Sequence, residues 1–176
     1  DAGEIIVRTQ YISLDPANRA WMNEEPTYMP PVPIGGPMLG LMMGEVTDTA
    51  SDKFKVGDKV MGLGSWSEYC KVNAEGFNAL PEIPGIPEKE VFGIFILVGP
   101  TAYFGMEDIC APKNGETVVV SGAAGAVGSI AGQLAKSHGC RVIGIAGGDK
   151  KCGWVTGEYG MDAAIDYKNE DVGARL

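Results

Sequence analysis

The chain has 176 residues, of which 45% are hydrophobic and 21% charged, and its formal net charge is −9. An apolar fraction near one half, with charges of both signs, is typical of a globular domain and excludes intrinsic disorder. No apolar run reaches the ~20 residues that span a bilayer, and the acidic balance argues against nucleic acid as a partner, since phosphate binding needs a basic face.

Residues 1–87 predict a β-rich domain. Short runs of β-branched and aromatic residues are separated by Gly, Pro or Asp, which is the pattern of strands and tight turns. Strands are predicted at residues 4–12, 44–49, 59–63, 68–72 and 77–80. Many short strands at close spacing favour a small barrel or sandwich. The five prolines between residues 26 and 37 predict a long irregular loop.

Residues 88–112 predict two connecting helices. The pattern is interrupted at Gly99 and Pro100, so we expect the break between the helices at that point. Pro100 suits the first turn of the second helix, where its missing N–H costs nothing.

Residues 113–176 predict alternating parallel strands and helices. Thr117 begins a continuous β-branched run, as a buried parallel strand requires. Strands are predicted at 117–121, 140–146 and 163–167, and helices at 129–137, from 149 to about 159, and from 169 onward. Asp149 is expected to cap the second of these helices.

A glycine-rich turn lies between the first of these strands and its helix. The fingerprint G-x-G-x-x-G falls on residues 123–128, with Ala123 in the first glycine position. Gly125 would let the backbone approach a pyrophosphate, and Gly128 would let the helix pack close to the strand. The N–H groups and the dipole at the helix start favour an anion. The turn therefore predicts a dinucleotide site; the alternative is a turn in a doubly wound sheet that binds nothing.

The end of the second strand favours NADP over NAD. An NAD site has Asp or Glu there, to accept hydrogen bonds from the ribose hydroxyls. This strand ends in Gly147 and Gly148, and the acid that follows, Asp149, comes late. Lys150 and Lys151 come next, and cations can accept a 2′-phosphate. The alternative for the two lysines is a solvated helix face.

The cysteines and the histidine do not form a metal-binding pattern. Cys70, Cys110, Cys140 and Cys152 are far apart, and His138 is the only histidine. A structural zinc site needs closely paired ligands, so the sequence predicts no metal site. Scattered single cysteines are typical of a reducing compartment, so we expect buried thiols and a cytoplasmic protein.

Three segments, residues 11–22, 99–105 and 119–152, resemble the zinc-independent medium-chain dehydrogenases/reductases. The resemblance is to the branch of leukotriene B4 12-hydroxydehydrogenase, prostaglandin reductase and curcumin reductase. It implies an α/β protein with a GroES-like β-rich domain at residues 1–87, then a Rossmann domain whose first half is residues 113–176. Since the sequence opens at Asp1 without an initiator Met, we expect further sequence upstream, and the second half of the Rossmann sheet downstream.

The resemblance also implies an activity and its residues. The activity is NADPH-dependent reduction of the C=C bond of α,β-unsaturated ketones and aldehydes, with a small-molecule substrate and a homodimer as one expectation. The residues that match the family's pyrophosphate turn are Gly125, Ala126, Val127 and Gly128. Lys151 matches a lysine that meets the 2′-phosphate, Tyr167 a tyrosine near the same end of the cofactor, and Thr101 a position on the nicotinamide side.

Tyr28 is the candidate catalytic residue. It matches a tyrosine of some relatives that hydrogen-bonds the substrate carbonyl, and the alternative is a loop aromatic that packs over the barrel. Many relatives carry a tyrosine where this chain has Ala17, so the substrate differs or is bound differently. Two other readings stay open: a quinone reductase of the same superfamily, and a homologue that binds nucleotide or serves a structural role without catalysis.

Overall fold

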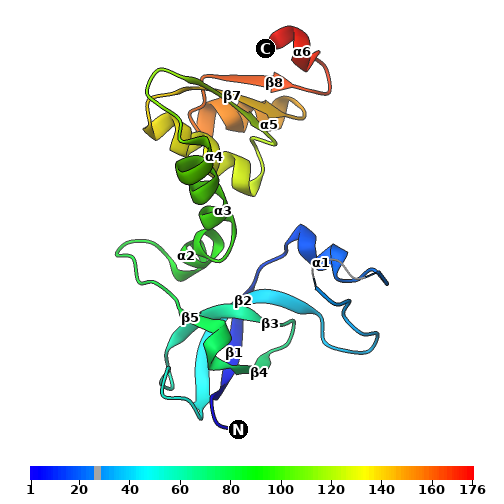
Figure 1. The fold of residues 1–176 in the computed structure, drawn as a ribbon, viewed down its shortest axis with the longest axis vertical. Helices are drawn as coiled ribbons and strands as arrows, with labels where there is room; N and C mark the ends of the chain where they lie inside the picture. The colour runs from blue at the N-terminus through cyan, green and yellow to red at the C-terminus, as the bar shows by residue number, and fades with distance from the viewer. Residues whose placement is uncertain (26–28) are drawn as a thin grey trace. The chain divides into compact units, whose positions relative to one another are not determined.

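The computed structural model describes residues 1–25 and 29–176 and divides into two compact units, Asp1–Ile96 and Leu97–Leu176. The division falls within the segment from which two connecting helices are expected. The first unit holds an antiparallel sheet and the second a parallel one (Figure 1). This order confirms the predicted fold class, a GroES-like sheet followed by the start of a parallel α/β sheet.

The first unit is a five-stranded antiparallel sheet with the order β4-β1-β2-β3-β5. Its strands are β1 (Glu4–Ile12), β2 (Leu39–Thr49), β3 (Lys59–Ser65), β4 (Tyr69–Asn73) and β5 (Phe77–Ala79). Its helices are α1 (Pro16–Ala20), the 3-10 turn η1 (Ala74–Gly76) and α2 (Glu88–Phe95). β1 has its predicted bounds, whereas β2 begins at Leu39 rather than at residue 44. Met42 and Met43 are both buried, so the start of β2 lacks the alternation that reveals a strand.

Apolar side chains cover both faces of this sheet. One face carries a core that includes Val7, Met42 and Phe77, all of them at most 1% exposed. On the other face, Met43 packs with Val91 and Phe92 of α2. Burying a side chain of this size contributes about 1.5–3 kcal/mol. The register of β1, β2 and β3 is therefore well defined, because a one-residue slip would expose these side chains.

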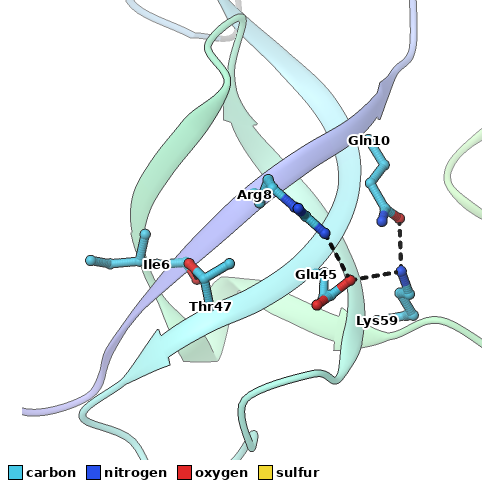
Figure 2. A network of polar contacts seen from close by, with 6 residues as sticks. All are labelled: Ile6, Arg8, Gln10, Glu45, Thr47 and Lys59. Carbon is cyan, nitrogen blue, oxygen red and sulfur yellow. Dashed lines mark hydrogen bonds and ion pairs between the residues drawn. The ribbon is translucent and has the colours of Figure 1, made fainter.

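Glu45 on β2 joins three strands through polar contacts (Figure 2). Its Oε2 accepts from Arg8 Nη2 on β1 and from Lys59 Nζ on β3, each at 3.2 Å. Lys59 Nζ also donates to Gln10 Oε1 at 3.1 Å. The Lys59 ammonium holds the pKa of the Glu45 carboxyl below its usual value. These contacts are exposed or half-buried, so they fix the strand register more than they add stability.

The second unit contains a three-stranded parallel sheet, with the order β6-β7-β8 (Figure 1). Its strands are β6 (Thr117–Ser121), β7 (Arg141–Ala146) and β8 (Ala163–Asp166). Its helices are α3 (Val98–Phe104), α4 (Ala126–Ser137), α5 (Asp149–Gly153) and α6 (Val172–Arg175), and the π-helical turns are η2 (Gly105–Cys110) and η3 (Trp154–Glu158). Val142, Val155 and Met161 are among the buried residues of its core. The three strands pair in parallel, as the alternation of strands and helices predicted.

Two local predictions in this region are wrong. The helices separate between Phe95 and Val98, not at Gly99 and Pro100, because Pro100 is tolerated within the first turn of α3. Asp149 does not cap α5. Gly148 occupies the N-cap position with φ 90°, and Asp149 is already the first helical residue, so its carboxylate does not cap the helix.

The thiols differ in burial. Cys70 and Cys140 are buried, Cys152 is half-buried and Cys110 is exposed, so the prediction of buried thiols is wrong for Cys110. Within residues 1–25 and 29–176, no group of three or more His, Cys, Asp or Glu side chains could hold a metal ion. In the same described ranges no single helix is long and apolar enough to cross a membrane. Only α2 taken together with Val98–Cys110, as a bent pair, meets that length and composition test.

Candidate nucleotide-binding site

The turn after β6 is held by backbone hydrogen bonds. Ala123 N donates to Ile145 O of β7 at 3.0 Å, which ties the turn to the neighbouring strand. Gly125 N donates to Gly122 O at 2.8 Å and closes the turn on itself. Gly122 has a φ of 62°, a conformation that favours glycine. Gly122 directly follows the strand and precedes the fingerprint by one residue, and its role in the turn was not predicted.

Gly128 lies where α4 passes closest to this turn. A Cβ added at Gly128 would lie 2.9 Å from the carbonyl carbon of Gly122 and 3.0 Å from Cα of Ala123. Both neighbours are backbone atoms, which cannot turn aside as the end of a side chain could. Gly128 is therefore required for the close approach of the helix to the turn.

The N-terminus of α4 opens toward solvent. Gly125 is the N-cap residue, with φ −85° and ψ 171°, and among the described residues no side chain caps the helix. Ala126 and Val127, in the first turn, are exposed. The first N–H groups of a helix have no partner within the helix, and the dipole makes this end attractive to an anion. The geometry fits the pyrophosphate of a dinucleotide.

Lys151 and Tyr167 are each hydrogen-bonded through their backbone to residues at the turn that follows β7. Lys151 is exposed on α5, and its backbone N donates to Gly148 O at 3.0 Å. Tyr167 follows β8, and its N donates to Ala146 O, the last residue of β7, at 3.1 Å. Lys150 differs from Lys151, because its Nζ lies 5.1 Å from the centre of the Trp154 ring. The structure thus brings two predicted residues, both solvent-accessible, to one edge of the sheet.

Asp166, the last residue of β8, is a second residue whose role was not predicted from the sequence. It is 6% exposed, and its Oδ1 accepts from Gly148 N at 2.8 Å and Lys168 N at 3.0 Å. These backbone N–H groups, Gly148 first, lower the pKa of the Asp166 carboxyl. An acid at the carboxyl end of a parallel strand, where α/β sheets bind ligands, was the available signal.

The remaining predicted residues are placed as follows. Thr101 lies on α3, a helix that packs against α4, and its Oγ1 donates to Leu97 O at 2.8 Å. Tyr28 lies outside the described residues. His138 is the C-cap residue of α4, at the end away from the glycine turn, and its Nε2 lies 2.6 Å from Glu107 Oε1.

Known proteins are similar to this chain in sequence and in fold. A family model described as the N-terminal domain of oxidoreductase matches residues 1–80. The NADPH-dependent curcumin reductase of Escherichia coli is 40% identical over 99% of this chain and 50% of its own length. The 2-alkenal reductase (NADP(+)-dependent) of Nicotiana tabacum is 36% identical over 99% of this chain and 52% of its own length.

A solved structure agrees with these relatives. CurA from Vibrio vulnificus, in complex with NADPH, matches with a TM-score of 0.88 and 37% identity, over 100% of this chain and 52% of its own. The chain spans about half the length of the curated relatives it matches. The likeness extends through both sheets and over nearly every residue of the chain. Over nearly its whole length the chain is therefore similar to the medium-chain dehydrogenase/reductase superfamily, in the branch of the curcumin, alkenal and prostaglandin reductases.

Proposed function

We propose that this chain is part of an NADPH-dependent reductase acting on the C=C bond of α,β-unsaturated ketones and aldehydes. The observation that carries the proposal is the close, backbone-lined turn at Gly128, which leads into the uncapped N-terminus of α4. Relatives named as NADPH-dependent curcumin reductase and 2-alkenal reductase support the choice of cofactor and reaction.

The residues of the second unit would bind and orient the dinucleotide. The N–H groups of the turn Gly125–Gly128 would hold the pyrophosphate. Lys151 and Tyr167 would contact the 2′-phosphate, since a lysine supplies a positive charge and a phenol a hydrogen bond. Thr101 would line the nicotinamide side. NADPH, when bound, supplies the hydride, and the protein orients it.

Tyr28 would donate a hydrogen bond to the substrate carbonyl oxygen. Reduction at the β-carbon of an enone places negative charge on that oxygen, and a donor directed at it lowers the barrier. A tyrosine with an ordinary pKa of about 10 is protonated at neutral pH and needs no tuning for this role.

We expect the full-length protein to oxidise NADPH faster with an alkenal or an aliphatic enone than with a quinone. The reason is that one carbonyl conjugated to one C=C bond matches the substrates of the named relatives. The measurement is the decrease of NADPH absorbance with each acceptor under matched conditions. Faster turnover with the quinone would instead favour the quinone reductase alternative, and dinucleotide binding without turnover would favour a non-catalytic homologue.

Tyr28→Phe is expected to lower turnover with enones by about tenfold, because the variant loses one hydrogen bond to a developing charge. The dissociation constant for NADPH should stay the same, since the phenol contacts substrate in this proposal. Steady-state rates and an NADPH titration on the same preparation separate the two effects. Unchanged turnover would remove Tyr28 from the mechanism.

A further inference from the structure

The residues that end β8 determine the shape of the turn after β7. Asp166 and Tyr167 are adjacent in the sequence but contact different parts of this turn. Asp166 Oδ1 accepts from the N–H of Gly148 at 2.8 Å, while the Tyr167 ring lies over Gly147. The turn is therefore held from the neighbouring strand.

Asp166 is linked to Lys151 by a short chain of hydrogen bonds. The carboxylate binds Gly148 N, and Gly148 O accepts from the backbone N of Lys151 at 3.0 Å. Gly148 is also the N-cap residue of α5, so its position determines where the first turn of that helix begins. The carboxylate is thus connected through Gly148 to the backbone of Lys151.

Asp166 can lie beside an anion site because its carboxylate is buried and already accepts hydrogen bonds from the protein. Besides Gly148 N, its carboxylate accepts from Lys168 N at 3.0 Å and from Asn169 Nδ2 at 2.7 Å. The Asp166 carboxylate is 6% exposed and bound by three donors, so it is largely shielded from a phosphate at the surface. It also cannot accept from ribose hydroxyls, as the exposed acid of an NAD site would.

The absence of a side chain at Gly147 leaves room for the ring of Tyr167. A Cβ at Gly147 would lie 2.7 Å from Tyr167 Oη and 2.8 Å from Cζ. The ring therefore occupies the space that a side chain at the end of β7 would take. An Asp or Glu at this position, the signature of an NAD site, would have to displace Tyr167.

We propose that Asp166 is a positioning residue for a 2′-phosphate, acting through Gly148 on Lys151, and that the absent side chain of Gly147 lets Tyr167 complete the same site. The ligand class is a nucleotide with a phosphate on the adenosine 2′ oxygen. The inference rests on the proposed function, in which Lys151 and Tyr167 bind NADPH. It adds that β8, and not the lysine alone, confers the preference for the phosphate.

The test is the ratio of the dissociation constants for NAD⁺ and NADP⁺, measured by titration of the full-length protein. Asp166→Ala is expected to lower this ratio about tenfold, because Lys151 loses its fixed position. Asp166→Asn keeps an oxygen that can accept from Gly148 N, so it should retain most of the preference. Gly147→Ala should lower the ratio as well, since the new methyl group displaces only the Tyr167 ring and the fold is expected to survive.

Asp162→Ala is the matched control. Asp162 also accepts from a backbone N–H of β7, Val142 N at 2.6 Å, but it lies at the opposite end of β8 and pairs with Lys136. Its loss should reduce stability and leave the ratio unchanged. An unchanged ratio in both Asp166→Ala and Gly147→Ala would overturn the inference while the proposed cofactor stands. A wild-type protein that binds NAD⁺ and NADP⁺ equally would overturn both.

Discussion

Gly128→Ala should weaken NADPH binding on the order of 100-fold, the loss of about two charge-assisted hydrogen bonds to the pyrophosphate. The new methyl group would meet the backbone of Gly122 and Ala123, so α4 must move away from the turn. The same overpacking should lower the free energy of unfolding by about 1–3 kcal/mol. Isothermal titration and urea denaturation of the full-length protein measure the two effects.

Gly105→Ala is the control for this substitution. Gly105 lies in the same unit with helical dihedral angles, φ −61° and ψ −40°, and nothing lies within 4 Å of an added Cβ. Alanine there should leave NADPH binding intact and stabilise the helical segment by about 0.5–1 kcal/mol. Wild-type affinity in Gly128→Ala would show that the close approach at this turn is not needed for binding.

Lys151→Ala is expected to weaken NADPH binding about tenfold and to leave NADH binding within about twofold of wild type. The lysine is exposed and, among the described residues, has no ion-pair partner, so its charge is available to a 2′-phosphate. The effect should decrease at high salt, because the contact is solvent-accessible. Parallel titrations with NADPH and NADH at two ionic strengths measure it.

Lys136→Ala provides the matching loss of one positive charge. Lys136 lies in the last turn of α4 and pairs with Asp162 at 2.8 Å, away from the glycine turn. If it weakened NADPH binding as much as Lys151→Ala does, the effect would be one of net charge and the assignment of Lys151 would be wrong.

Strong local patterns predicted much of the fold. The continuous run from Thr117 to Ser121 identified a parallel strand with its observed bounds, although only Val120 in it is buried, so its predicted burial is wrong. The bounds of β1 were also predicted as observed. In both cases the signal lies within a few consecutive residues. The same is true of the glycine turn, which was recognised from its spacing, although α4 begins at Ala126 and not at residue 129 as predicted.

Features that depend on tertiary contacts could not be predicted in this way. Asp166 and Gly148 are hydrogen-bonded but lie 18 positions apart in the sequence. No local sequence pattern indicates that a carboxylate at the end of β8 binds the backbone of the turn after β7. Asp149 was expected to cap α5 because its residue type is common at caps, but the glycine before it takes the cap geometry. Residue propensity therefore identified Asp149 as a candidate cap, but the backbone conformation places Gly148 in the N-cap position.

The two ends of α4 differ in a way that links ligand binding to folding. The C-terminal end of α4 contains Lys136 in its last turn and His138 at its C-cap, and the His138 ring is hydrogen-bonded to Glu107. The N-terminal end has no side-chain cap among the described residues. An uncapped helix end typically forgoes about 1 kcal/mol. An anion bound there restores this energy, so the ligand acts as the missing cap. By linkage, the stability of the second unit would increase with the logarithm of the ligand concentration above its dissociation constant.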